Sequence, residues 1–584
     1  MAELSNSKKE RLTVNTIKSL ADAPGSYLIP EISVGDKGIS FDGHISVMSD
    51  DTETKESLIG RVPVQVKGTE VEEFCEGLIT FSFDIADYRN FLSSDGVLLL
   101  VGEVKPSGET KLYYKSLLAL EIHELLQRYG KQKSRVIELR PIGETRLYDI
   151  CCKFLAEQEH QPRELIRHRP FNIDDFQKFK FSSLTYSLNP TEPLRKIFDH
   201  DFTMYGILNQ THFPLVQVRF NSIGASQIVK FTDGDSEYDI FTENIFKESV
   251  DTLILENSFI FEFSRNDVSY RYLNFNSLAA QKRIIPMLIS LFSGQKLSFE
   301  ENIIQMLPQN DILVELRCWQ SFLEDLEYTF DLLGINPEFV IEESKDIDTG
   351  REMEWLVHRV YIKNYAGLTM PDNKGFVNYK LGNKCVVLFY NPFAEDRFLN
   401  AFAHEVAEIG VYVQGENDNK HFHSIYVLLT EESLVKGVNL NIQKIKYSFD
   451  RCDPFSNELV ADYTNKFCLS CINAYVQSGN RELLDLANYI YDRTIGTESE
   501  GEDYILINKL QIKLWRNEDL TIDESNILYQ KKILAIKDNN LNLLFCVNVL
   551  LRNRVESTLT FEQMFPEKQE YFKTLPIFKF FEKL

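Results

Sequence analysis

The residues with the clearest chemical meaning lie in one short segment, residues 39–70, which reads ISFDGHISVM and, after a polar loop, GRVPVQVKGTE. Asp42 stands at the start of one apolar stretch, and Gln65 and Lys67 stand together in the next. A carboxylate and a second oxygen ligand can hold Mg²⁺ against a phosphate group, while a nearby lysine stabilises the negative charge that develops there. These residue types point to metal-dependent hydrolysis of a phosphodiester.

The spacing of Gln65 and Lys67 predicts that their side chains lie on one face of a strand. Side chains alternate along a strand, so Gln65 and Lys67 share a face about 7 Å apart, opposite the face formed by three valines. If the strand that begins near Asp42 pairs with this one, Asp42 can approach the same end. Burying a lysine or a glutamine without a polar partner is costly, so the pattern indicates a polar site.

The elements expected around these residues form one α/β layer. A helix is predicted over residues 8–21, and a second helix over residues 113–128. Between them we expect strands at 27–34, 39–48, 60–68, 78–85 and 96–104, with a short helix at 88–91. Helix, four or five strands and helix make a compact domain that ends near residue 145.

These residues resemble the PD-(D/E)XK nuclease superfamily, in the subset where glutamine replaces the acidic member of the E-x-K pair, as in Mrr-like restriction enzymes and several bacterial defence nucleases. The resemblance covers roughly residues 8–125. It implies that Asp42 is the metal carboxylate, that Gln65 is a metal ligand through its carbonyl oxygen, and that Lys67 is the catalytic lysine. The ion implied is Mg²⁺ or Mn²⁺.

Three further residues are peripheral to this resemblance. Asp36 lies in the turn before the first of the two strands, and Thr69 follows the lysine. Many members of the superfamily also use a glutamate on the first helix, for which Glu10 is the candidate in this chain. Glutamine carries no charge, so the resemblance implies weaker binding of two metal ions than a full pair of carboxylates would give.

The remainder of the chain predicts a multidomain α+β protein. Residues 1–145 form the restriction-endonuclease-like α/β domain, and residues 146–300 form a linker helix and a β-rich domain. Residues 301–584 are mainly helical and repeat-like, although no clean repeat signature is present. A length of 584 residues is consistent with two to four domains.

Composition bounds the environment of the protein. Nine irregularly spaced cysteines are typical of a reducing compartment, and the first residues lack a secretory signal, so we expect a cytoplasmic protein. No apolar run approaches 18 residues, so we expect no membrane span. The net charge of −24 argues against a general nucleic-acid coat protein. Residues 128–180 are the exception, with 12 basic and 8 acidic side chains, and they form either a rail for phosphates or a solvated linker.

Two other motifs suggest metal or redox chemistry less specifically. Cys468 and Cys471 form a single CxxC in a helical stretch, where core packing is the expected role. His404, Glu405 and Glu408 resemble part of a zinc-binding helix, with His421 and His423 nearby, but a plain helix with surface carboxylates explains them as well. The sequence contains no GxxxxGK[ST] loop and no GxSxG elbow.

The leading hypothesis is a cytoplasmic, metal-dependent nuclease that acts as a bacterial anti-phage defence effector, with DNA rather than RNA as the expected substrate. The C-terminal helices would sense a phage trigger or bind a protein partner, and a homo-oligomer is compatible with this role. The alternative is a non-catalytic scaffold that carries a decayed nuclease fold. A zinc hydrolase centre at residues 395–425 is a third reading.

Overall fold

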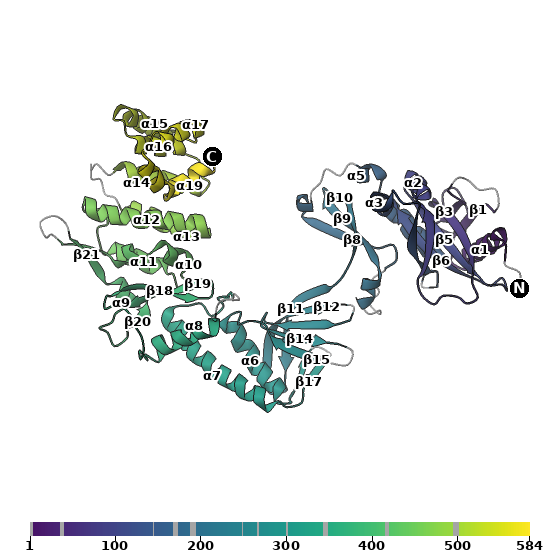
Figure 1. The fold of residues 1–584 in the computed structure, drawn as a ribbon, viewed down its shortest axis with the longest axis horizontal. Coiled ribbons are helices and arrows are strands. Elements are labelled where there is room, and N and C mark those ends of the chain that lie inside the picture. The colour runs from purple at the N-terminus through teal and green to yellow at the C-terminus, as the bar shows by residue number, and fades with distance from the viewer. Residues whose placement is uncertain are drawn as a thin grey trace. The chain divides into compact units, whose positions relative to one another are not determined.

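The computed structural model describes most of the chain, and its elements are labelled in Figure 1. The described residues are 4–34, 40–143, 145–167, 173–186, 194–247, 249–264, 268–299, 302–342, 348–414, 420–493 and 502–584. They form two compact units, one of residues 1–224 with 245–251 and the other of residues 225–244 with 252–584. The division into three domains at residues 145 and 300 stays a prediction.

A seven-stranded mixed sheet organises the start of the first unit. Its strand order is β1-β2-β3-β5-β6-β7-β4. The strands are β1 (Leu28–Ile32), β2 (Gly43–Met48), β3 (Leu58–Glu70), β4 (Ile79–Asp84), β5 (Gly96–Val104), β6 (Thr110–Leu118) and β7 (Ser134–Pro141). The helices are α1 (Asn6–Ala21), α2 (Ile85–Ser93), α3 (Ala119–Tyr129) and α4 (Leu147–Gln158). β2 runs antiparallel to β3, and β5 runs parallel to it.

Each face of this sheet supports its own hydrophobic core. Helices α1 and α4 pack on the face that carries Val62, Val64 and Val66 of β3. Helices α2 and α3 cover the face that carries Leu99 and Val101 of β5. Because side chains alternate along β3, Gln65 and Lys67 belong to this second face.

Two glycines on neighbouring strands allow α1 to approach the sheet closely. Gly68 of β3 and Gly102 of β5 are opposite each other in the parallel register. A methyl group on Gly68 would lie 2.8 Å from the backbone of Lys9, and one on Gly102 would lie 2.3 Å from the Thr13 hydroxyl. Side chains at either position would push α1 away from the strand that bears the candidate site.

The helix predicted over residues 113–128 is wrong in its first half, which belongs to strand β6. This strand pairs with β5 along its full length, and α3 begins only at Ala119. Both faces of β6 are largely buried, so the apolar residues of this run fall in adjacent pairs, Tyr113-Tyr114 and Leu117-Leu118, and do not alternate with polar ones. Such a run has no period of two, and it cannot be told from a buried helix by sequence pattern. The predicted helix at 8–21 and the predicted strands between the two helices are confirmed within a few residues.

The first unit continues into a smaller antiparallel sheet. Its strands are β8 (Lys178–Ser182), β9 (Asp201–Leu208) and β10 (Thr211–Arg219), in the order β10-β9-β8. Helix α5 (Arg163–Arg167) packs against β10. This sheet begins the strands of the β-rich region that the sequence predicted within residues 146–300.

A second seven-stranded sheet opens the second unit, with strand order β15-β14-β13-β12-β11-β16-β17. The strands are β11 (Ile223–Thr232), β12 (Glu237–Phe246), β13 (Asp251–Leu255), β14 (Phe259–Phe263), β15 (Val268–Tyr272), β16 (Lys296–Phe299) and β17 (Asn302–Gln305). Helices α6 (Leu278–Phe292) and α7 (Asn310–Leu333) share its core. The core extends to α8 (Thr349–Leu356), β18 (Gly375–Leu381) and β19 (Lys384–Tyr390).

The last part of the second unit is helical, with consecutive helices in layers (Figure 1). It contains α12 (Glu458–Ser478), α13 (Arg481–Tyr491), α14 (Glu502–Trp515), α15 (Ile522–Lys537), α16 (Leu541–Leu550), α17 (Arg554–Glu562), α18 (Pro566–Lys573) and α19 (Pro576–Glu582). This agrees with the predicted helical C-terminal region. No helix within the described ranges has the length and apolar content needed to cross a membrane.

Candidate functional site

The structure brings Asp42 and Gln65 into direct contact. Asp42 lies just before β2, and its backbone N–H donates to the Val64 carbonyl of β3. The Asp42 Oδ2 atom accepts hydrogen bonds from Gln65 Nε2 at 2.6 Å and from the Val66 backbone N–H at 2.7 Å. Asp42 is 3% exposed and Gln65 is 4% exposed. The predicted pairing of the two strands is therefore correct.

Gly43 fixes the position from which Asp42 reaches β3. Its φ of +148° is unfavourable for residues with a side chain, and a methyl group there would lie 2.0 Å from the Glu31 carbonyl of β1. On the other side of Asp42, Ser40 donates to Asp87 of α2 and accepts from Asn90 of the same helix, each at 2.7 Å. Asp42 is therefore fixed in position by the close pairing of β1 and β2 at Gly43 and by the contacts of Ser40 with α2.

Lys67 lies two residues beyond Gln65 on the same face of β3. It is half-buried, and it makes no hydrogen bond or ion pair with any residue that the structure describes. Its neighbour on β5 is Val101, which is fully buried. The Lys67 side chain is therefore half-buried beside an apolar neighbour and contacts no carboxylate of the described residues, so its ammonium is available to an anionic ligand.

The oxygen atoms of Asp42 and Gln65 suit a magnesium ion whose remaining ligands come from water and from the substrate's phosphate. Gln65 Nε2 points to Asp42, and the Gln65 Oε1 atom accepts no hydrogen bond from any described residue. Asp42 and this carbonyl oxygen are oxygen ligands on neighbouring side chains, with the Gln65 Nε2 atom between them. Mg²⁺ is commonly bound by one or two protein ligands, with waters and substrate phosphates completing its shell. Within the described ranges, no cluster of three or more His, Cys, Asp or Glu side chains has metal-binding geometry.

The peripheral candidates are not gathered at this contact. Thr69 lies on the same face of β3 but two residues beyond Lys67. Glu10 belongs to α1, which packs on the opposite face of the sheet. Asp36 lies outside the described residues.

The sequence did not reveal a buried carboxylate at the end of the neighbouring strand. Glu103 of β5 is 7% exposed and is opposite Thr69, on the face that carries Lys67. Glu103 Oε2 accepts from the Cys75 N–H and from the Tyr113 hydroxyl, each at 3.0 Å. Burial and this hydrogen bond raise the pKa of Tyr113, which keeps its proton for donation. The signal in the sequence is a charged residue at the end of the apolar run GVLLLVGEV.

Glu103 and its neighbours hold the segment that follows β3 in place through hydrogen bonds. The Cys75 carbonyl accepts from Lys111 Nζ at 2.6 Å and lies 2.6 Å from the Tyr113 hydroxyl, which shares its single proton between this carbonyl and Glu103. Lys105 lies over the Phe74 ring at 4.3 Å from its centre. The acidic segment that starts at Val71 is therefore anchored at the end of the sheet near Lys67.

Part of the basic stretch at residues 128–180 is engaged by carboxylates. Arg146 pairs with Asp149 at 2.9 Å, and Arg163 lies 3.7 Å from Asp95. Arg135 instead stacks on the Tyr129 ring. These contacts describe a solvated surface, and a role as a rail for phosphates stays a prediction.

The other sequence motifs have structural explanations. Cys468 and Cys471 are fully buried in the helical core, as expected for packing residues, and burial raises the pKa of both thiols. His423 is fully buried; its Nδ1 atom accepts a hydrogen bond from the Ser424 N–H, and its Nε2 atom bonds to the Thr464 hydroxyl. Burial lowers the pKa of His423 to about 4. His404 instead faces Glu408 in a largely exposed pair.

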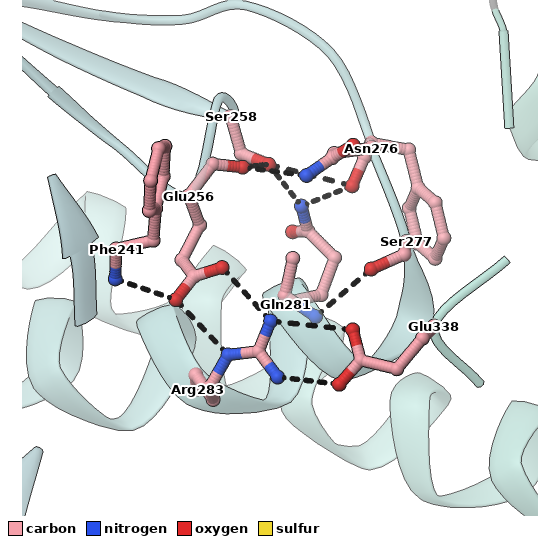
Figure 2. A network of polar contacts seen from close by, with 10 residues as sticks. Phe241, Glu256, Ser258, Asn276, Ser277, Gln281, Arg283 and Glu338 are labelled. Carbon is pink, nitrogen blue, oxygen red and sulfur yellow. Dashed lines mark hydrogen bonds and ion pairs between the residues drawn. The ribbon is translucent and has the colours of Figure 1, made fainter. Parts of the chain in front are cut away.

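A dense polar network in the second unit surrounds Glu256, and Figure 2 shows its geometry. Glu256 is nearly buried and accepts two hydrogen bonds at 2.9 Å from Arg283 and a third from the Phe241 N–H. Arg283 also donates to Glu338 at 2.8 Å. The Glu256 backbone has a φ of +49°, in the turn between β13 and β14. The network fastens this turn to α6, and we assign it a structural role.

No protein-family description, curated protein or solved structure matches this chain.

Proposed function

We propose that the N-terminal α/β domain is a metal-dependent nuclease whose site consists of Asp42, Gln65 and Lys67. The observation that carries the proposal is the half-buried Lys67, without an anionic partner among the described residues, on the same face as the Asp42–Gln65 contact. A phosphodiester would supply the missing negative charge. The superfamily resemblance supports the same assignment.

The chemistry follows from the positions of the three side chains. A bound Mg²⁺ would polarise the scissile phosphate and acidify the attacking water. Asp42 and the carbonyl oxygen of Gln65 would hold the ion; because Gln65 Nε2 now faces Asp42, the amide would have to turn so that its oxygen lies beside the carboxylate. Lys67 would contact a phosphate oxygen and stabilise the charge that grows there in the transition state.

The wider role that we propose is a bacterial anti-phage defence effector that cuts DNA, with RNA as the alternative substrate. The C-terminal helices would bind a protein partner or a phage trigger, and self-association would be one means of control. This wider role is supported by the resemblance to defence nucleases alone. The acidic chain, with its net charge of −24, would weaken binding to bulk nucleic acid before activation.

Cleavage by the full-length protein is the direct test. Plasmid DNA, linear DNA and structured RNA are incubated with the protein in Mg²⁺ or Mn²⁺, beside Asp42→Asn and Lys67→Ala. Lys55→Ala is the matched control, because Lys55 is an exposed lysine in a loop of the same unit. We expect both site variants to lose cleavage and the control to retain it. Equal cleavage by all variants would contradict the proposal.

The second candidate function is a non-catalytic scaffold with a decayed nuclease fold. The observation in its favour is the small number of carboxylates at the site, where Asp42 is joined by a neutral glutamine. A scaffold predicts no cleavage of any of the three substrates by folded protein. It also predicts that Lys67→Ala leaves partner binding unchanged, whereas substitutions on the C-terminal helices weaken it.

A further inference from the structure

A cleft of about 460 Å³ lies within the first unit, where the large sheet divides. Pairing between the described residues of β6 and β7 is confined to Tyr113 and Tyr114 of β6. Beyond this point β6 continues to Leu118, whereas β7 pairs with β4 instead. The cleft lies between the diverging strands, and α3 and the small sheet of β8, β9 and β10 supply its other walls. Its volume is typical of a ligand site, for which about 300–1,000 Å³ is usual.

Four charged side chains in this cleft are paired with one another. Lys115 Nζ lies 2.9 Å from Glu121 and 3.6 Å from Asp201. Arg219 lies 3.0 Å from the same Asp201 carboxylate. Two cations and two carboxylates therefore balance within the protein, and this group needs no charged ligand. Glu138, the remaining acidic residue of the described lining, is exposed.

Arg135 lines the same cleft without a carboxylate partner among the described residues. It is half-buried, its guanidinium donates no hydrogen bond to any of them, and its Nε atom is enclosed without a partner. The guanidinium carbon lies 3.8 Å from the centre of the Tyr129 ring. Stacking uses the face of a guanidinium, whereas its N–H groups lie in its plane. The contact with Tyr129 therefore fixes the orientation of this cation without using its donors.

A buried hydroxyl without a partner lines the cleft as well. Ser116 of β6 is 4% exposed, and its side chain makes no hydrogen bond with any described residue. Buried polar groups in folded proteins nearly always have a partner, so an acceptor in the cleft is expected. Leu78 and Val136, which are 45% and 53% exposed, add apolar surface to the same lining.

We propose that this cleft binds a ligand through a phosphate group, with Arg135 as the main contact and Ser116 as a second donor. Water can accept the same hydrogen bonds, but it brings no charge to a guanidinium that lacks a carboxylate. A phosphate does both, because its oxygens match the fork of a guanidinium and a third oxygen is left for a hydroxyl. The described lining has four basic and three acidic side chains, a positive balance in a chain of net charge −24. Leu78 and Val136 would contact the organic part of the ligand.

The phosphate has two possible sources, a free nucleotide and a nucleic-acid strand. Gln65, Leu99 and Lys115 form one row across β3, β5 and β6, so the cleft lies about 10 Å, or two strand spacings, from Gln65. A strand held at the nuclease site could reach the cleft over this distance, and this source rests on the proposed function. Binding of a free nucleotide is independent of it.

Calorimetric titration of the full-length protein with AMP, adenosine and hexathymidylate tests the proposal. EDTA is present throughout, so metal-dependent cleavage does not affect the result. We expect AMP or hexathymidylate to bind, and adenosine, which lacks the phosphate, to bind at least tenfold more weakly than AMP. Tighter binding of AMP identifies a free nucleotide as the ligand, and tighter binding of hexathymidylate identifies a strand. Absence of binding by both phosphate-bearing probes would overturn the proposal.

Substitutions locate the site. We expect Arg135→Gln to weaken binding of the preferred probe at least tenfold, Arg135→Lys to weaken it less because the charge remains, and Ser116→Ala to weaken it about threefold. Arg128→Gln and Ser46→Ala are matched controls, since Arg128 is exposed on α3, Ser46 is buried in β2 and neither lines the cleft. Equal binding by Arg135→Gln and Arg128→Gln would refute the proposal. Binding that is lost in Lys67→Ala but kept in Arg135→Gln would refute it too, because the ligand would then occupy the nuclease site.

Discussion

Removing the Asp42 carboxylate should destabilise the N-terminal domain as well as remove a metal ligand. In Asp42→Ala, the Val66 N–H and the Gln65 amide lose their shared acceptor in a place that water reaches poorly. Each buried donor left without a partner costs about 1–3 kcal/mol, so the expected loss is roughly 4 kcal/mol. For a unit of this size, that loss lowers the midpoint of thermal unfolding by about 10 °C.

Asp42→Asn separates the structural effect from the chemical one. The asparagine keeps one side-chain oxygen that can accept from the Val66 N–H, so we expect a loss of about 1–2 kcal/mol. The two variants therefore differ in stability, although both remove the charge that would bind Mg²⁺. Inactivity of the alanine variant alone would not identify a catalytic residue.

The assay combines thermal unfolding of the full-length protein with amide hydrogen exchange in peptides that span residues 62–70. Exchange reports on the Val66 amide directly and is insensitive to unfolding of the second unit. We expect faster exchange at this segment in Asp42→Ala and near-normal exchange in Asp42→Asn. If the alanine variant unfolds within 2 °C of the wild type and protects Val66 equally well, the proposed anchoring role of Asp42 is wrong.

Three further predictions follow from other contacts. Gly43→Ala should destabilise the first unit in thermal unfolding, because its methyl group would meet the Glu31 carbonyl; an unchanged midpoint would refute this. Arg283→Ala should cost about 3 kcal/mol in chemical denaturation, because it leaves Glu256 buried with a carboxylate that has lost its cation, and the added Glu256→Gln change should recover part of the loss. His423 has a folded-state pKa of about 4, so the unfolded state binds more protons between pH 6.5 and 4, and stability should fall by up to about 3 kcal/mol as pH decreases through this window. Unfolding of His423→Gln should show a weaker dependence on pH, and an identical pH profile would count against it.

The sequence was informative wherever the relevant contacts are local. Gln65 and Lys67 are two residues apart on one strand, so the period of the strand alone places them on one face. Asp42 lies immediately before the preceding strand, and one antiparallel pairing is sufficient to bring it to Gln65. The same reasoning failed for β6, because a strand buried on both faces loses the alternation that identifies it.

The sequence was silent wherever position depends on register between distant elements. Glu103 reaches the face of Lys67 through the parallel register of β3 and β5, which no local pattern specifies. Cys75 is held through its backbone atoms, so its side chain gives no signal of the contact.

The polar sites at Glu256 and at Lys67 differ in how far their charges are balanced within the protein. Around Glu256, the buried carboxylate meets a guanidinium and a backbone N–H, and the same guanidinium also meets Glu338 (Figure 2). A network in which the charges balance one another needs no ligand, and it stabilises one arrangement of the turn. At Lys67 the balance is incomplete, because the half-buried lysine side chain and the Gln65 carbonyl oxygen have no partner among the described residues. Folding alone gives no reason to keep such groups near an apolar core. The imbalance is explained if a phosphate and a metal ion complete the site, and this is the strongest physical argument for placing the chemistry of the chain there.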